Sequence, residues 1–182
     1  MIHAQAAIHA GLCTTALIVY ASTQRSATRK VAAALEHFPF ETDYKPLLPV
    51  GAYALAAQRH MALYGTTPEQ LAQIAVSTRQ WALRNPKAWE KEPLSIDQVL
   101  GARRVSEPFG VRDCCLVNDG GGAIIVTSAE RARDMKKKPV HVLGHGDEMS
   151  HRNISQMEEL TVTRAVESGA SAYRMAGIGP QD

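Results

Sequence analysis

The chain has 182 residues, enough for one substantial hydrophobic core or for one domain with an excursion. Its 20 Lys and Arg against 18 Asp and Glu give a net charge of +2, so the overall charge favours neither nucleic acid nor an anionic membrane as a partner. Three cysteines, an odd number without framework spacing, argue against a disulfide scaffold and for a reducing compartment.

No apolar stretch approaches the roughly 20 residues that cross a membrane. The N-terminus carries histidines where a secretory signal has cations, and no cleavage pattern follows. We therefore expect a cytoplasmic protein without a membrane span.

The first residues predict a helix followed at once by a strand. Met1–Leu12 is apolar and rich in alanine, and Gly11 is suited to close a buried helix there. Thr14–Ala21 is a short β-branched run, typical of a strand buried on both faces of a parallel or mixed sheet. This order is half of a β-α-β unit, so the predicted fold class is α/β.

A mostly helical insertion is predicted from Ser22 to about Gly110. Ser22–Val50 contains prolines at 39, 46 and 49 together with polar breaks, which indicates irregular structure. Gly51–Tyr64 has a helical pattern.

Two further helices in the insertion carry start signals. Thr67 stands before Pro68 and three residues before Gln70, and Ser95 has the same spacing to Gln98, so each predicts a capping box. The first of these helices ends before Asn85-Pro86. We expect one of its faces to consist of Leu71, Ile74, Ala75, Thr78 and Trp81.

The α/β pattern returns after the insertion. The predicted elements are a strand at Gly122–Thr127, a helix at Ser128–Met135, a strand at Val140–Leu143 and a helical stretch within Gln156–Ala176. The run Lys136-Lys137-Lys138 fits a solvated helix end, because cations are favoured at helix C-termini.

Three local patterns suggest ligand sites, but each lacks residues that such a site requires. Gly120-Gly121-Gly122 precedes its strand and has no following lysine, so we expect a tight turn with close backbone packing rather than a phosphate loop. Gly144-His145-Gly146 lacks the third glycine of a dinucleotide fingerprint. His141, His145 and His151 have no supporting cysteine or carboxylate pattern, so we expect no metal.

Several segments together resemble the thiolase family, most closely the sterol-carrier-protein-type (lipid-transfer-protein) thiolases. Ala6–Cys13 with Ala16–Tyr20 resembles the helix and strand that follow the family's nucleophile. The remaining similar segments are His60-Met61, Tyr64–Ala72, Asn85–Ala88, Pro93–Pro108 and Asn118–Ala123. The resemblance covers nearly the whole chain, and the combination of segments is specific where one alone is weak.

The resemblance implies part of a layered α-β-α thiolase fold with a mostly helical loop domain. It assigns residues 1–23 to the end of the N-terminal half, 24–117 to the loop domain, 118–136 to a return to the N-terminal half and 137–182 to the start of the C-terminal half.

The resemblance assigns no catalytic residue to this chain. The position of the family's nucleophilic cysteine falls before Met1, and the second-half catalytic motifs fall beyond Asp182, so we expect no activity from the chain alone. Cys13 is a poor substitute, because it lies at the end of its predicted helix, where the dipole disfavours a thiolate.

Substrate contact is what the resemblance does carry over. His60 and Met61 match a His-Met pair beside the pantetheine channel, and Cys115 stands where many thiolases have a small serine. Leu116 replaces a usual glycine, which would narrow the channel. The alternative is that Met61, Cys114 and Cys115 are packing residues and His60 a satisfied imidazole.

These assignments imply an acyl-CoA acyltransferase that contains no cofactor beyond the coenzyme A of its substrate. We expect acyl-CoA as ligand, a homo-oligomer or a small acyl-CoA-binding subunit as partner, and no nucleic acid or membrane partner. Two alternatives stay open: a non-catalytic partner-binding module or retro-aldolase-type subunit, and an unrelated nucleotide-binding α/β protein, which lacks a phosphate loop.

Overall fold

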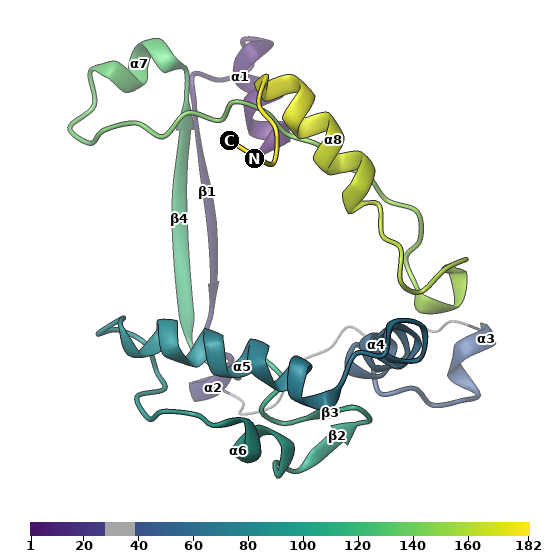
Figure 1. Ribbon diagram of the computed structural model, residues 1–182. Coiled ribbons are helices and arrows are strands. Elements are labelled where there is room, and N and C mark those ends of the chain that lie inside the picture. Colours follow the sequence, from purple (N-terminus) through teal and green to yellow (C-terminus); the bar gives the residue numbers. More distant parts are fainter. Residues whose placement is uncertain (28–38) are drawn as a thin grey trace. The chain divides into compact units, whose positions relative to one another are not determined.

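The computed structural model describes residues 1–27 and 39–182, which divide into two compact units (Figure 1). The sheet unit consists of the described residues of Met1–Ala34, Val117–Met149 and Arg164–Asp182. The helical unit consists of the described residues of Leu35–Leu116 and Ser150–Thr163. The assignment of segments to the two halves of a thiolase stays a prediction. No helix in the described ranges is both long and apolar enough to cross a membrane.

The sheet unit is built on two long antiparallel strands. β1 (Thr15–Ser22) pairs with β4 (Gly120–Thr127) in a register that runs from Thr15 opposite Thr127 to Ser22 opposite Gly120. The helix α1 contacts both strands. The helices of this unit are α1 (Ile2–His9), α2 (Gln24–Ala27), α7 (Ala129–Arg133) and α8 (Ala165–Ala176).

The predicted α1 and β1 both exist, but their predicted burial is wrong. Neither contains a buried residue. Leu17, Val19 and Ile125 share one face of the strand pair and are 61–66% exposed. Within the described residues the pair is antiparallel and has no third strand, so one face of this sheet lacks the covering layer that a buried α/β strand has.

The predicted strand at Val140–Leu143 is also wrong, since these residues form no ladder with any described strand. β-Branched residues favour extended backbone, but a strand also requires a hydrogen-bonded neighbour. The helix predicted at Ser128–Met135 is confirmed in the shorter α7, and the helical stretch within Gln156–Ala176 is confirmed by α8.

Gly120, Gly121 and Gly122 belong to β4 and do not form the tight turn that we expected. β4 begins at Gly120, two residues before the predicted start at Gly122. The close packing that we expected is present: a Cβ on Gly121 would lie 2.9 Å from the Cβ of Ala21 on the paired strand. Glycine therefore lets the two strands approach at this end of the ladder.

Asp119 joins the two chain segments that enter and leave this end of the sheet. Its Oδ1 accepts the backbone N–H groups of Arg25 (2.9 Å) and Ser26 (3.1 Å) at the start of α2. The hydrogen bond from Ser26 is the main reason why the pKa of Asp119 is lowered; Arg25 adds to it.

We therefore expect stability to depend on pH through Asp119. Because its folded pKa lies below the unfolded value, its contribution is fully present above that unfolded value, near pH 4, and is lost as pH falls through the folded pKa. Urea unfolding of wild type and Asp119→Asn across this acidic range measures it. The variant should show the smaller slope, and equal slopes would contradict this role.

The helical unit contains the capped helices that the sequence predicts. Both predicted capping boxes are present: Thr67 and Ser95 accept from the backbone N–H groups of Gln70 and Gln98, whose side chains accept in return. The elements are α3 (Pro39–Thr42), α4 (Val50–Tyr64), α5 (Pro68–Leu83), α6 (Ile96–Leu100), β2 (Arg104–Ser106), β3 (Phe109–Gly110) and the 3-10 helix η1 (Ile154–Gln156). The predicted irregular Ser22–Val50 contains α2 and α3; its residues 28–38 lie outside the described residues.

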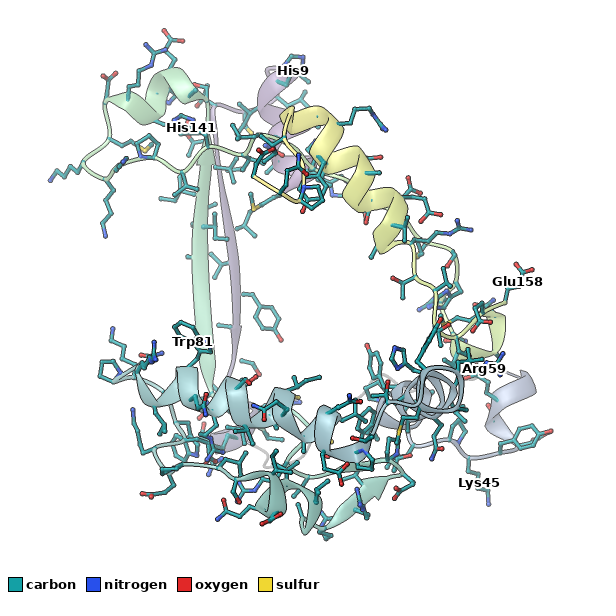
Figure 2. The ribbon with its side chains drawn as sticks, viewed as in Figure 1. His9, Lys45, Arg59, Trp81, His141 and Glu158 are labelled. Carbon is teal, nitrogen blue, oxygen red and sulfur yellow. The ribbon has the colours of Figure 1, made fainter. Side chains whose placement is uncertain are left out.

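The core of this unit lies between α5 and α6. Ala72, Val76 and Val99 are buried there, at 1%, 8% and 2% exposure. Of the face that we expected on α5, Ala75 packs against this cluster, whereas Ile74 and Trp81 are 65% and 69% exposed. Figure 2 shows Trp81 on the side of α5 away from α6. The small side chain of Ala72 lets the two helices approach, and Trp81 instead packs under the guanidinium of Arg84, 4.7 Å from its ring centre.

The Gly-His-Gly segment of the sheet unit lies directly against the backbone of α8. A Cβ added to Gly146 would overlap the carbonyl oxygen of Ser168 and lie 2.7 Å from its carbonyl carbon. A Cβ on Gly144 would overlap the carbonyl oxygen of Ala172 and lie 2.9 Å from the backbone nitrogen of Ala176. These glycines allow a close backbone crossing, which accounts for them without a dinucleotide.

Candidate functional site

The end of α4 holds two of the three predicted substrate contacts, His60 and Met61. The His60 ring is exposed, its Nδ1 lies 2.9 Å from Oγ1 of Thr66, and its centre lies 4.6 Å from that of the Tyr64 ring. Met61 is half-buried, and its carbonyl accepts the N–H of Gly65, whose φ of 68° ends the helix. Tyr64 at the end of α4 and Thr66 in the turn after it therefore contact the imidazole from two sides.

Tyr64 and Thr66, which support His60, were not predicted from the sequence. The signal was present for Tyr64, because residues four apart on a helix lie on the same face. Thr66 lies beyond the end of the helix, where the left-handed Gly65 returns the chain toward His60, so helical spacing alone does not reveal it.

An ion pair lies on the same helix as His60. Arg59 Nε is 3.9 Å from Glu159 Oε1, and Figure 2 shows Arg59 on α4. Glu159 also accepts the backbone N–H and the hydroxyl of Thr161, which are the main reasons why its pKa is lowered, with Arg59 adding to them. This half-buried carboxylate therefore stays ionised at neutral pH and lies opposite the Arg59 guanidinium.

The third predicted contact, Cys115, lies in the segment after the β2–β3 hairpin. Asp113 Oδ2 accepts the backbone N–H of Gly110 at 2.8 Å, and the thiol of Cys114 donates to the Gly110 carbonyl at 3.5 Å. Cys114 is half-buried, whereas Cys115 and Leu116 are exposed. Desolvation by burial raises the pKa of Cys114, and Coulombic interactions with the neighbouring Asp113 and Cys115 raise it further.

The structure places His60, Met61 and Cys115 in the same unit but joins them by no direct hydrogen bond or ring contact among the described residues. A hydrogen bond instead links α4 to the β2–β3 hairpin: the Gln58 side chain on α4 donates to the carbonyl of Glu107 at 3.3 Å. An imidazole with a fixed orientation and an exposed thiol lie on this unit, which can contact a polar chain such as an amide-containing arm. The contact of these three residues with substrate stays a prediction.

The cysteines differ in exposure and environment, which gives a chemical test of the site. We expect Cys115 to react with iodoacetamide at pH 7 well before Cys114, because Cys114 is half-buried and its raised pKa leaves less thiolate. Peptide mass spectrometry of a timed reaction measures both rates. The variant Asp113→Asn should speed the reaction of Cys114 by removing a neighbouring negative charge, and an unchanged rate would contradict that cause.

The sheet unit has an open hollow of about 310 Å³ between α1, the Gly-His-Gly segment and α8. Its lining is mostly apolar, with two imidazoles and the amide of Gln5, whose Oε1 is buried and has no hydrogen-bond partner among the described residues. The lining residues are Ile2, Gln5, Ala6, His9, Val142, Gly144, His145 and Met175. Of the three histidines considered for a metal, only His145 lies here, and no described group of three or more ligating residues could hold a metal ion.

Comparison with known proteins identifies the family. Residues 146–182 match the family model described as thiolase C-terminal domain-like. The benzoylsuccinyl-CoA thiolase subunit BbsB of Thauera aromatica is 37% identical over 72% of this chain and 34% of that protein. The steroid side-chain-cleaving aldolase of Thermomonospora curvata is 29% identical over 97% of this chain and 49% of that protein.

A solved structure extends the similarity to the backbone. The Ltp2-ChsH2(DUF35) aldolase superposes with a TM-score of 0.81 and 28% identity, over 97% of this chain and 48% of that one. Sterol carrier protein 2 of Rattus norvegicus is 29% identical over 71% of this chain and 25% of that protein. The chain thus spans between a quarter and a half of the length of these relatives. The recognition from sequence is confirmed: the chain belongs to the thiolase family and is related to its sterol-carrier-protein-type members.

Proposed function

We propose that this chain is part of an enzyme that makes or breaks a carbon–carbon bond in acyl-CoA thioesters of lipid or sterol metabolism. The observation that carries the proposal is the similarity to the Ltp2-ChsH2 aldolase, which extends over 97% of the chain with a TM-score of 0.81 and so includes both units. In this proposal the sheet unit contributes to a layered α-β-α fold, and the helical unit is the loop domain that contacts coenzyme A.

The proposed coenzyme A contact consists of His60, Met61 and Cys115. Supporting this, His60 and Cys115 are exposed while their neighbours are held by hydrogen bonds, so both can contact a ligand without unfolding their segments. Coenzyme A belongs to the substrate, and the reaction chemistry of the family needs no other cofactor. A small acyl-CoA-binding subunit or a second copy of the chain is the proposed partner.

The chain by itself is proposed to bind acyl-CoA without turning it over. A thiolase nucleophile requires a thiol with a lowered pKa near a helix N-terminus. Cys13 follows the C-terminal end of α1, where the dipole has the opposite sign. Cys114 has a raised pKa, and Cys115 follows a hairpin rather than starting a helix.

The second candidate function is retro-aldol cleavage, as part of a multisubunit acyl-CoA enzyme. It is favoured because two matches that each extend over 97% of this chain, at 28–29% identity, are named aldolases, whereas the match to the thiolase subunit BbsB covers 72%. The two reactions differ in stoichiometry. Thiolysis consumes one coenzyme A thiol for each carbon–carbon bond broken, whereas retro-aldol cleavage of a β-hydroxyacyl-CoA gives a carbonyl product and a shorter acyl-CoA without free coenzyme A.

Titration calorimetry with a 3-ketoacyl-CoA tests the proposal. We expect weak binding by wild type and a roughly fivefold weaker affinity for His60→Ala, since one hydrogen bond is worth about 1 kcal/mol. His3→Ala is the matched control, because His3 is exposed on α1 in the other unit. No binding, or equal losses in both variants, would contradict the proposed contact. Turnover by the chain alone would contradict the proposed division between binding and chemistry.

A further inference from the structure

A dense group of cations follows β4 and is not explained by the proposed acyl-CoA contact. We define the basic segment as residues 131–138, which are the end of α7 and the loop after it. Figure 1 shows α7 and this loop standing away from the β1–β4 pair. Its five cations are all exposed; they are Arg131, Arg133, Lys136, Lys137 and Lys138.

The cations of the basic segment have no partner among the residues that the structure describes. None of them forms an ion pair or a side-chain hydrogen bond within that part of the chain. Arginines elsewhere are engaged, for example Arg79 with Glu90 at 3.1 Å and Arg104 with Glu107 at 3.6 Å. The positive charge of the segment is therefore directed to solvent and serves no interaction within the described fold.

The near-neutral charge of the chain conceals this concentration. Five cations and the single anion Asp134 give the basic segment a charge of +4, which leaves the other residues at −2 within the total of +2. At physiological ionic strength charges are screened over about 8 Å, so a charged surface responds to the local group and not to the chain average. The expectation of no membrane partner, which relied on net charge, does not apply to this segment.

Apolar side chains accompany the cations. Met135 lies among them and is 43% exposed, and Val140 follows them and is 93% exposed. Cations beside exposed apolar groups suit the boundary of an anionic bilayer, where the charges approach headgroups and the apolar groups enter the interface. Single-stranded nucleic acid fits less well, because the stretch between Phe109 and Tyr173 contains no Phe, Tyr or Trp, the side chains with the largest rings for base stacking. A fixed protein partner fits less well, because no described contact holds the cations in one geometry.

We propose that the basic segment, with Met135 and Val140, attaches this protein reversibly to membranes that contain anionic phospholipids. The attachment is weak, since it combines several screened charges with only two apolar side chains. It is independent of the acyl-CoA contact on the helical unit.

Vesicle flotation tests the proposal, because self-associated protein sediments whereas vesicle-bound protein rises. Wild type should float with phosphatidylcholine vesicles that contain about one-third phosphatidylglycerol, and remain unbound with pure phosphatidylcholine or in about 0.5 M salt. The triple variant Lys136→Gln/Lys137→Gln/Lys138→Gln should lower the partition coefficient on the order of 100-fold. Val140→Ser should lower it about tenfold.

A control variant separates local charge from net charge. Lys87→Gln/Arg103→Gln/Arg112→Gln removes the same charge from exposed positions of the helical unit and should float like wild type. Equal losses in the two triple variants would overturn the proposal, as would equal binding to uncharged vesicles. Binding to poly-glutamate without binding to vesicles would also overturn it and identify an acidic protein surface as the partner.

Discussion

Replacing Gly146 by alanine is expected to lower the free energy of unfolding of the sheet unit by about 3 kcal/mol. The new methyl group would overlap the carbonyl oxygen of Ser168 and lie 2.7 Å from its carbonyl carbon. These atoms belong to the backbone of α8, so no side-chain rotation can relieve the overlap. Relief requires that α8 and the Gly-His-Gly segment separate, which loosens the crossing at Gly144 as well and opens the hollow that both line.

Gly169→Ala is the matched control, since Gly169 lies in the same helix and a Cβ there would meet nothing within 4 Å. Alanine is the better helix former, so this control should raise the free energy of unfolding by about 1 kcal/mol. Urea unfolding followed by circular dichroism measures both variants. Changes of opposite sign in the free energy of unfolding would distinguish a backbone overlap at Gly146 from a general sensitivity of α8 to substitution. An unchanged free energy of unfolding for Gly146→Ala would show that α8 and the Gly-His-Gly segment do not cross this closely.

Local chemistry accounts for the parts of the fold that could be predicted. The starts of α5 and α6 depend on a hydroxyl and a glutamine three residues apart, so Thr67 and Ser95 identify them without tertiary information. The buried face of α5 could not be predicted this way. The large apolar side chains of Ile74 and Trp81 are the ones that a sequence pattern would place in the core. The residue that packs against Val99 is instead Ala72, because its small side chain lets α5 and α6 approach closely.

Non-local contacts explain the remaining differences. The need for glycine at 144 becomes visible only when α8, more than twenty residues later in the chain, is placed against it. Val140–Leu143 has the composition of a strand but no described strand pairs with it. At the candidate site the sequence supplied His60, Met61 and Cys115 by resemblance. Their supports depend on the turn at Gly65 and on the Asp113 hydrogen bond to the backbone of Gly110, which are properties of the folded chain.

The exposed apolar face of the strand pair predicts that the isolated chain associates with itself. Leu17, Val19 and Ile125 on one face of the strand pair are 61–66% exposed and form a contiguous apolar surface. Apolar surfaces of this kind mark sites of association.

We therefore expect the isolated chain to self-associate at micromolar concentration, as measured by sedimentation velocity, unless a partner covers this face. Val19→Lys/Ile125→Lys should shift the distribution toward monomer while leaving the circular dichroism spectrum unchanged, because both side chains are 61% exposed and lose little packing. Ala10→Lys/Gln80→Lys adds the same charge at other exposed positions and should leave association unchanged, which separates the strand face from general charge repulsion. A monodisperse wild-type monomer that melts cooperatively would show that the strand pair needs no cover, and the proposed requirement for a partner would then fail.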